Sequence, residues 1–156
     1  MRGVPRASDN DAVEQRADLG GALWCALVEA YLCRRHLVDD VAATVGLTAG
    51  DLRTLFALQP GVPRAHRVLA EILHRDPANV TWLVDRLEAK GYTERVRHLR
   101  DRRVRLVVLT EAGAEAQVKV RDGLAVPPPE FEHMAVEDLE ALVDLLGRVP
   151  RPPYWP

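Results

Sequence analysis

The chain has 156 residues, of which 47% are hydrophobic and 28% are charged, and its net charge at pH 7 is −2. This is the composition of a globular protein large enough for one core, or for one core plus a helical dimerisation layer. There is no apolar run of about 18 residues and no secretion signal near Met1, which excludes a membrane-spanning helix and leads us to expect a cytoplasmic protein.

A long helix is the first predicted element. Residues 1–11 are polar, and we expect them to be disordered. From Ala12 to about Val45, apolar residues recur at spacings of three and four, which is the pattern of one buried helical stripe. Gly46 is placed to end this helix, because glycine adopts the left-handed conformation that follows many helices.

Two short helices are predicted next. Thr48 can cap the first, with Asp51 three residues later as a weaker form of the capping box, and the Pro-Gly pair at 60–61 ends it. Pro63 starts the second, which runs to about His74. Their buried sides are predicted to hold Leu52, Leu55, Phe56 and Leu58 in the first, and Leu69, Ile72 and Leu73 in the second.

The third short helix has the clearest start, because Asp76 is a good N-cap residue and Pro77 fits the first helical position. It runs to about Lys90, and Gly91 ends it. Helical spacing predicts a buried face of Val80, Leu83, Val84 and Leu87. The outward side then holds Ala78, Trp82, Asp85 and Ala89, flanked by Thr81 and Arg86.

After Gly91 the periodicity changes to that of β-strands. Tyr92–His98 and Arg103–Leu109 are predicted to be two strands joined by a short turn. In the second strand, Val104, Leu106 and Val108 occupy every second position. Arg103, Arg105 and Val107 occupy the positions between them.

The C-terminal part is again helical. Thr110 caps a helix to about Ala125, Pro127–Pro129 interrupt the pattern, and a last helix covers about Val136–Gly147. The tail 150–156 is rich in proline and expected to be extended. Three short helices followed by a two-stranded hairpin are the arrangement of a winged helix-turn-helix. The predicted fold is therefore mainly α with a small antiparallel β-hairpin.

Positive charge is concentrated in this module. Between Pro63 and Arg105, eleven basic residues stand against six acidic ones, so this segment carries +5 and the rest of the chain −7. A charge run is usually a solvated face, but acids are nearly absent from the hairpin and its turn projects the charge. We therefore predict a surface for a polyanion. Asp101 could hold Arg103 in a fixed direction, which suits a narrow minor groove.

The third helix of such a module can enter the major groove, with its N-terminal end nearest the base edges. Asn79 and Thr81 could donate to phosphates or bases, Arg86 could clamp a phosphate, and Asp85 is expected to pair with a neighbouring arginine. Trp82 has two interpretations. It either packs against the preceding helix or the hairpin, or contacts a thymine methyl or a sugar edge.

Two segments resemble the MarR family of transcriptional regulators. Residues 76–91, DPANVTWLVDRLEAKG, are similar to its recognition helix. Residues 101–113, DRRVRLVVLTEAG, are similar to its wing signature, an Asp-x-Arg followed by Leu-Thr-x-x-Gly. The resemblance covers roughly Leu19–Val149. It departs from the family at Trp82, where many members have a small or basic residue, and at the proline break, which shortens the helix after the wing.

The resemblance implies a homodimer whose terminal helices intertwine and whose two winged modules bind a palindromic site in double-stranded DNA. It implies a repressor that leaves its operator when a small aromatic ligand or metabolite binds between the dimer layer and the winged module. The chain would then begin with a disordered N-terminus (1–11) and a dimerisation helix (12–46). The winged module (47–110), the C-terminal dimerisation helices (111–149) and a tail (150–156) would follow.

The predicted DNA-binding residues combine the outward face of the third helix, the hairpin and one arginine before them. By the resemblance, Arg103 is the wing-tip residue for the minor groove and Asp101 orients it. The full set is Arg67, Ala78, Asn79, Thr81, Trp82, Arg86, Arg100, Asp101, Arg102, Arg103 and Arg105.

Other functions remain as alternatives. One is a winged-helix protein–protein interaction module that does not bind DNA. Another is redox sensing through Cys25 or Cys33, which lie too far apart on one helix for a disulfide and are otherwise expected to be small buried side chains. We expect no enzymatic activity, cofactor or metal, because the five histidines show no metal-ligand spacing and no nucleophile partner.

Overall fold

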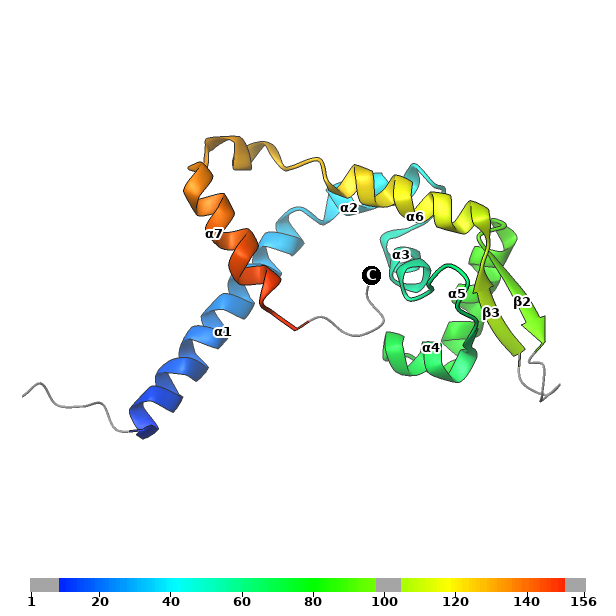
Figure 1. Ribbon diagram of the computed structural model, residues 1–156, viewed down its shortest axis with the longest axis horizontal. Coiled ribbons are helices and arrows are strands. Elements are labelled where there is room, and N and C mark those ends of the chain that lie inside the picture. Colours follow the sequence, from blue (N-terminus) through cyan, green and yellow to red (C-terminus); the bar gives the residue numbers. More distant parts are fainter. Residues whose placement is uncertain (1–8, 98–104, 151–156) are drawn as a thin grey trace, which may run out of the picture. The chain divides into compact units, whose positions relative to one another are not determined.

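The computed structural model describes residues 9–97 and 105–150 and divides the chain into two compact units, Met1–Leu37 and Val38–Pro156 (Figure 1). Each unit is described by itself below. Among the described helices, none combines the length and the apolar character that a membrane span requires.

The first unit contains α1 (Asp9–Cys33) and the start of α2 (Arg35–Ala43). The prediction of one continuous helix from Ala12 to Val45 is wrong, because the chain turns at Arg34. There the amides of Arg34 and Leu37 bond to carbonyls three residues back, at 3.1 and 3.0 Å, instead of four. No proline or glycine marks this turn, so no local pattern predicts it.

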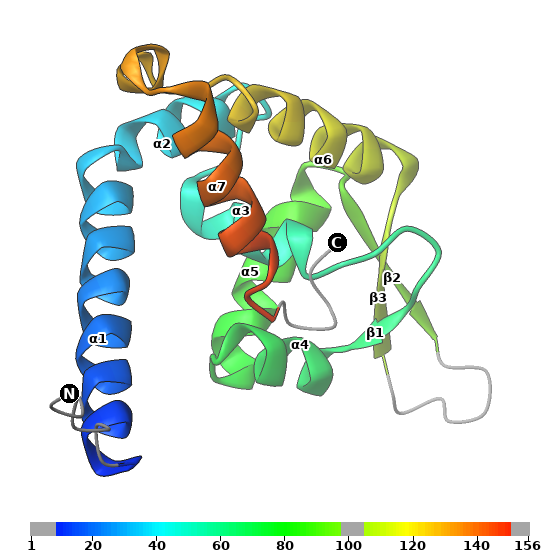
Figure 2. The same ribbon diagram turned by 60° about the vertical axis from the view of Figure 1, so that its left-hand side comes forward.

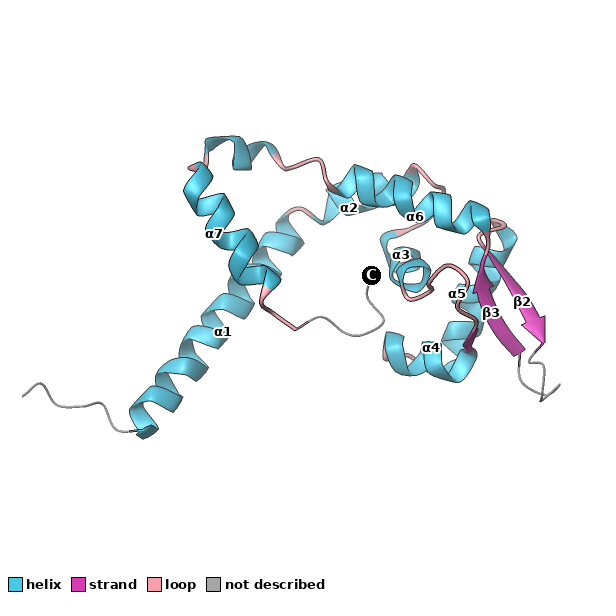
Figure 3. Cartoon of the chain, in the orientation of Figure 1, coloured by secondary structure: helices cyan, strands magenta, loops and turns pink. Residues whose placement is uncertain are grey.

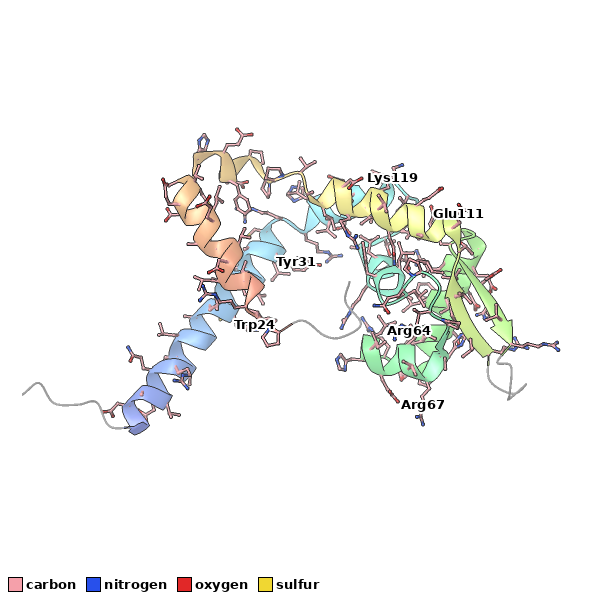
Figure 4. All side chains as sticks on the ribbon, viewed as in Figure 1. Trp24, Tyr31, Arg64, Arg67, Glu111 and Lys119 are labelled. Carbon is pink, nitrogen blue, oxygen red and sulfur yellow. The ribbon has the colours of Figure 1, made fainter. Side chains whose placement is uncertain are left out.

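The side chains of α1 are mostly exposed. Cys25 and Cys33 are both exposed thiols, so the interpretation of the two as small buried residues is wrong for the isolated chain. Large apolar side chains share this exposure: Leu19, Leu23, Trp24, Leu27, Tyr31 and Leu32. Figure 4 labels two of them, Trp24 and Tyr31, on this helix.

The second unit holds the core. After Gly46, which has the left-handed φ of 66° expected at a helix end, the chain forms the elements of a winged helix. These are α3 (Ala49–Phe56), β1 (Arg64–Ala65), α4 (His66–Leu73), α5 (Pro77–Ala89), β2 (Thr93–Arg97) and β3 (Arg105–Leu109). In Figure 2, α5 lies among α3, α4 and the sheet, and these elements are in contact with it.

The sheet has three antiparallel strands in the order β1-β3-β2, so the predicted two-stranded hairpin is incomplete. Arg64 pairs with Val107 and Ala65 with Leu106, which means that the helix predicted to start at Pro63 begins only at His66. A strand of two residues shows no periodicity, and its partner lies about forty residues away in the sequence. Val107 is fully buried, because β3 is the central strand.

The capping predictions have mixed outcomes. Thr48 and Asp51 form a complete capping box on α3, in which each side chain bonds to the other residue's backbone amide. Asp76 precedes α5, but its carboxylate accepts a hydrogen bond from the Asn79 side chain at 2.9 Å and does not cap the backbone. The buried face of α5 is confirmed: Val80, Val84 and Leu87 are fully buried, and Leu83 packs partly buried against them.

The C-terminal elements agree with the sequence. Thr110 caps α6 (Glu111–Leu124) by accepting a bond from the Gly113 amide at 3.1 Å. The proline segment ends α6, and a short 3₁₀ helix, η1 (Pro129–His133), precedes α7 (Val136–Gly147), as the helix and loop colours of Figure 3 show. No residue of α7 is buried.

Candidate functional site

The outward face of α5 is exposed as predicted. Ala78, Asn79 and Trp82 are all exposed, and the Trp82 side chain keeps 56% of its surface open to solvent. The guanidinium of Arg86, one turn later on the same helix, lies over its ring. The structure therefore favours the outward-facing interpretation of Trp82.

The polar side chains on this face already have partners within the protein. The Thr81 hydroxyl donates to the Pro77 carbonyl at 3.0 Å, and the Asn79 amide donates to Asp76 at 2.9 Å. A hydroxyl has one hydrogen to donate, so Thr81 in this rotamer offers its methyl group and oxygen lone pairs to a ligand.

The Arg86 side chain is held in place by Asp51 of α3 and by the Trp82 ring. Its Nη2 donates to Oδ2 of Asp51 at 2.7 Å, and its guanidinium lies 4.7 Å from the centre of the Trp82 ring. The same Asp51 oxygen accepts bonds from the amide and the hydroxyl of Thr48, at 2.9 and 2.7 Å. Asp51 is 1% exposed and Arg86 about one-third exposed, so this pair is partly shielded from water. A role of Arg86 as a phosphate contact stays a prediction, and a phosphate would have to compete with Asp51.

Arg95 fixes the hairpin to α5. Its guanidinium bonds to Asp85 and to Glu88, one turn apart on the helix, and the Arg95 side chain is four-fifths buried. The prediction that Asp85 pairs with a neighbouring arginine is confirmed. Two carboxylates held by one guanidinium fix the position of β2 relative to α5.

A basic groove lies where α4, α5 and the sheet meet. It has a volume of about 620 Å³ and is lined by Ala65, His66, Arg67, Thr81, Asp85, Arg95 and Arg105. Arg67 and Arg105 are exposed, whereas Arg95 and Asp85 neutralise one another. Arg67 pairs with the exposed Glu71 at 3.5 Å, and an ion pair of this kind contributes little. The groove thus presents the positive charges of two exposed arginines, Arg67 and Arg105, to a ligand. Figure 4 shows Arg67 on α4.

Three of the predicted binding residues, Arg67, Thr81 and Arg105, come together in this groove. The predicted residues Arg100, Asp101, Arg102 and Arg103 lie outside the described residues. Sequence reasoning did not single out His66 or Arg95. His66 depends on the position of β1, and Arg95 on a packing contact between strand and helix, which no local pattern reveals.

A second pocket of about 310 Å³ lies between α2, α3 and α6. Its lining is mostly apolar, with two arginines at the edge: Val38, Ala49, Leu52, Arg53, Phe56, Arg121 and Leu124. Both Arg53 and Arg121 are exposed. An apolar pocket with two cations suits a small molecule that has an apolar body and a negative group.

Comparison with known proteins gives a consistent result. The MarR family model matches residues 48–104. MarR of E. coli in its apo form has 21% identity and a TM-score of 0.68, over 83% of this chain and 97% of that protein. The regulator BldR of Sulfolobus solfataricus has 26% identity and a TM-score of 0.60, over 85% and 98%.

A cysteine-to-serine mutant of E. coli MarR in complex with operator DNA also matches, with 21% identity and a TM-score of 0.62, over 83% of this chain and 94% of that protein. The search of curated protein sequences finds no match. The matched segment contains α3, α4, α5 and β2, and it includes every residue that lines the basic groove except Arg105. Residues 48–104 are therefore similar to the MarR family, and the chain has the winged-helix fold of these MarR-family structures.

Proposed function

We propose that this protein is a homodimeric repressor that binds a palindromic operator in double-stranded DNA and is released by a small-molecule effector. The observation that carries the proposal is the basic groove, where Arg67 and Arg105 flank the exposed face of α5. A helix in the major groove brings its flanks against phosphates, and free cations at those flanks contribute most of the affinity. E. coli MarR has been solved with operator DNA, which supports the same use of this fold.

Dimer formation is supported by the terminal helices. Exposed leucines, a tryptophan and a tyrosine cover α1, and Leu142, Leu145 and Leu146 of α7 are also exposed. Apolar area on this scale is unusual on a monomer and typical of an interface. A second copy of the chain would bury it, and a dimer with two winged modules matches a two-fold symmetric site.

The apolar pocket between α2, α3 and α6 is the proposed effector site. Replacing Arg53 and Arg121 with alanine is expected to raise the effector concentration needed for half-release by about tenfold or more, because each arginine offers a charge-assisted hydrogen bond to an anionic group. Affinity for DNA without effector should stay within about twofold, since neither residue lines the basic groove. The measurement is release of labelled duplex during titration with a panel of aromatic carboxylic acids.

Arg148→Ala is the control for that titration, because it removes the arginine that follows α7 and lies outside the pocket. The effector assignment is wrong if Arg148→Ala and the pocket variant shift the titration equally, or if no acid in the panel releases the wild-type complex.

The alternative function, a protein–protein module without DNA binding, predicts a different outcome in one experiment. The protein is mixed with a random duplex library, bound duplexes are recovered, and the selected sequence is compared with an unselected duplex of equal length. A repressor selects a palindrome and binds it as a dimer. A protein–protein module gives no enrichment, and this result would refute the proposed function.

A further inference from the structure

The outward face of α5 combines polar side chains that already have partners within the protein with an exposed apolar surface. Thr81 and Asn79 donate within the helix, Asp85 is bound by Arg95, and Arg86 is bound by Asp51. Beside the remaining N–H and Oδ1 of Asn79, the first two turns of α5 present three apolar groups: the Ala78 side chain, the Thr81 methyl and the Trp82 indole.

Trp82 is held in a defined direction. The Arg86 guanidinium covers one side of the indole, at 4.7 Å from the ring centre, and Asp51 fixes that guanidinium at 2.7 Å. Asp51 itself is fixed by the Thr48 amide and hydroxyl at the start of α3. This chain of contacts ties an exposed side chain to the buried end of another helix. An aromatic ring ordered before binding loses less entropy when a ligand contacts it.

A small residue, Ala78, lies one helical turn before Trp82 and leaves that side of the indole accessible. Ala78 lies four residues ahead on the same face, so no long side chain shields the indole on that side. The N-terminal half of such a helix is the part that comes nearest the base edges.

We propose that Trp82 is a specificity-determining residue that recognises the C5-methyl group of thymine in the major groove, and that Arg86 is a positioning residue for it. The proposal rests on the proposed function, because it names what α5 contacts in the operator. Among the base edges in the major groove, thymine alone presents a methyl group, and apolar side chains are its natural partners. The indole has one donor and no acceptor, so it cannot accept a hydrogen bond from an amino group, and its large apolar surface is suited to a methyl contact.

The test replaces single thymines of the selected duplex by deoxyuridine, which removes the methyl group and keeps every hydrogen-bonding group. For the wild type, at least one such replacement in each half-site is expected to weaken binding by about fourfold, the effect of one methyl group leaving an apolar contact. Trp82→Ala should bind the thymine and deoxyuridine duplexes equally at that position. Trp82→Phe, which keeps an aromatic ring, should retain part of the difference.

Arg86 is tested by the same difference. Arg86→Gln removes the stacked guanidinium and is expected to reduce the methyl effect at the same thymine, whereas Arg86→Lys should restore part of it by keeping a cation near Asp51 and the ring. A purely structural role would lower affinity for both duplexes by the same factor. Circular dichroism and the unfolding midpoint show whether each variant is folded.

The outcomes separate the two proposals. Failure of the wild type to bind any selected duplex refutes the proposed function itself. Binding with no deoxyuridine effect, with an effect that persists in Trp82→Ala, or to a selected site without thymine in its half-sites overturns the assignment of Trp82 and leaves the proposed function standing.

Discussion

Gly113→Ala is expected to lower the stability of the winged unit by about 3 kcal/mol, which corresponds to a fall of about 10 °C in the unfolding midpoint. A Cβ at this position would lie 2.1 Å from the Tyr92 carbonyl oxygen and 2.8 Å from Cδ1 of Leu109. The carbonyl cannot move freely, because it also accepts the Thr110 amide at 3.0 Å. The backbone of α6 would have to shift away from the wing. Thermal unfolding followed by circular dichroism measures the change.

Gly50→Ala is the matched control. Gly50 also lies in the first turn of a helix, α3, but a Cβ there would meet only the Thr48 hydroxyl at an ordinary 3.6 Å. Alanine favours helices more than glycine does, so the midpoint should stay constant or rise. Equal midpoints for the two variants would show that α6 does not approach Tyr92 as closely as the structure has it.

Arg67→Ala combined with Arg105→Ala is expected to reduce affinity for the selected duplex by roughly 10,000-fold or more at low salt. Each exposed arginine can form a charge-assisted hydrogen bond with a phosphate, which contributes about 1.5 kcal/mol or more. A dimer carries each change twice and so loses four such contacts. The slope of log affinity against log salt should also become shallower by about 4, because each phosphate contact accounts for about one unit.

Controls for this prediction come from within the chain. Arg148→Ala removes the exposed positive charge that follows α7 and pairs with Asp144, and should change affinity by less than about twofold. The single variants at 67 and 105 should each give roughly half of the double effect on a logarithmic scale. If the double variant binds the duplex as tightly as Arg148→Ala does, the basic groove is not the DNA-contacting surface.

Sequence reasoning succeeded where the determining interactions are local. The start of α5 follows from Pro77, its end from Gly91, and its buried face from the spacing of three or four residues, all within one helix. The exposure of Trp82 could be predicted as one of two interpretations for the same reason. The left-handed Gly46 in the turn after α2 and the cap of α6 at Thr110 are equally local features.

It failed where the determining contacts join distant segments. β1 exists because Arg64 and Ala65 pair with β3, and nothing within two residues announces a strand. Asp51 could be predicted as a capping residue. Its ion pair with Arg86, 35 residues later, could not, because that pair depends on the packing of α3 on α5. The carboxylate that completes the predicted cap therefore also positions Trp82.

The wing shows a similar division. Its arginine density is visible in the sequence, but which arginine is exposed and which is bound to α5 depends on the fold. Arg95 is used to hold the wing on α5, whereas Arg105 remains exposed in the basic groove. The proposed role of Arg103 at the wing tip rests on the sequence. Arg103→Ala is expected to weaken binding to the selected duplex.

The most direct test of the account is the affinity of the wild-type protein for its selected duplex, measured between about 50 and 200 mM salt together with the number of protomers bound. A dimer that contacts several phosphates in each half-site should lose affinity by about 1000-fold or more over this range. Two protomers should bind each duplex. Binding that is independent of salt, or no tighter than binding to an unselected duplex of the same length, would contradict the claim that α5 and the basic groove form a specific DNA-binding surface.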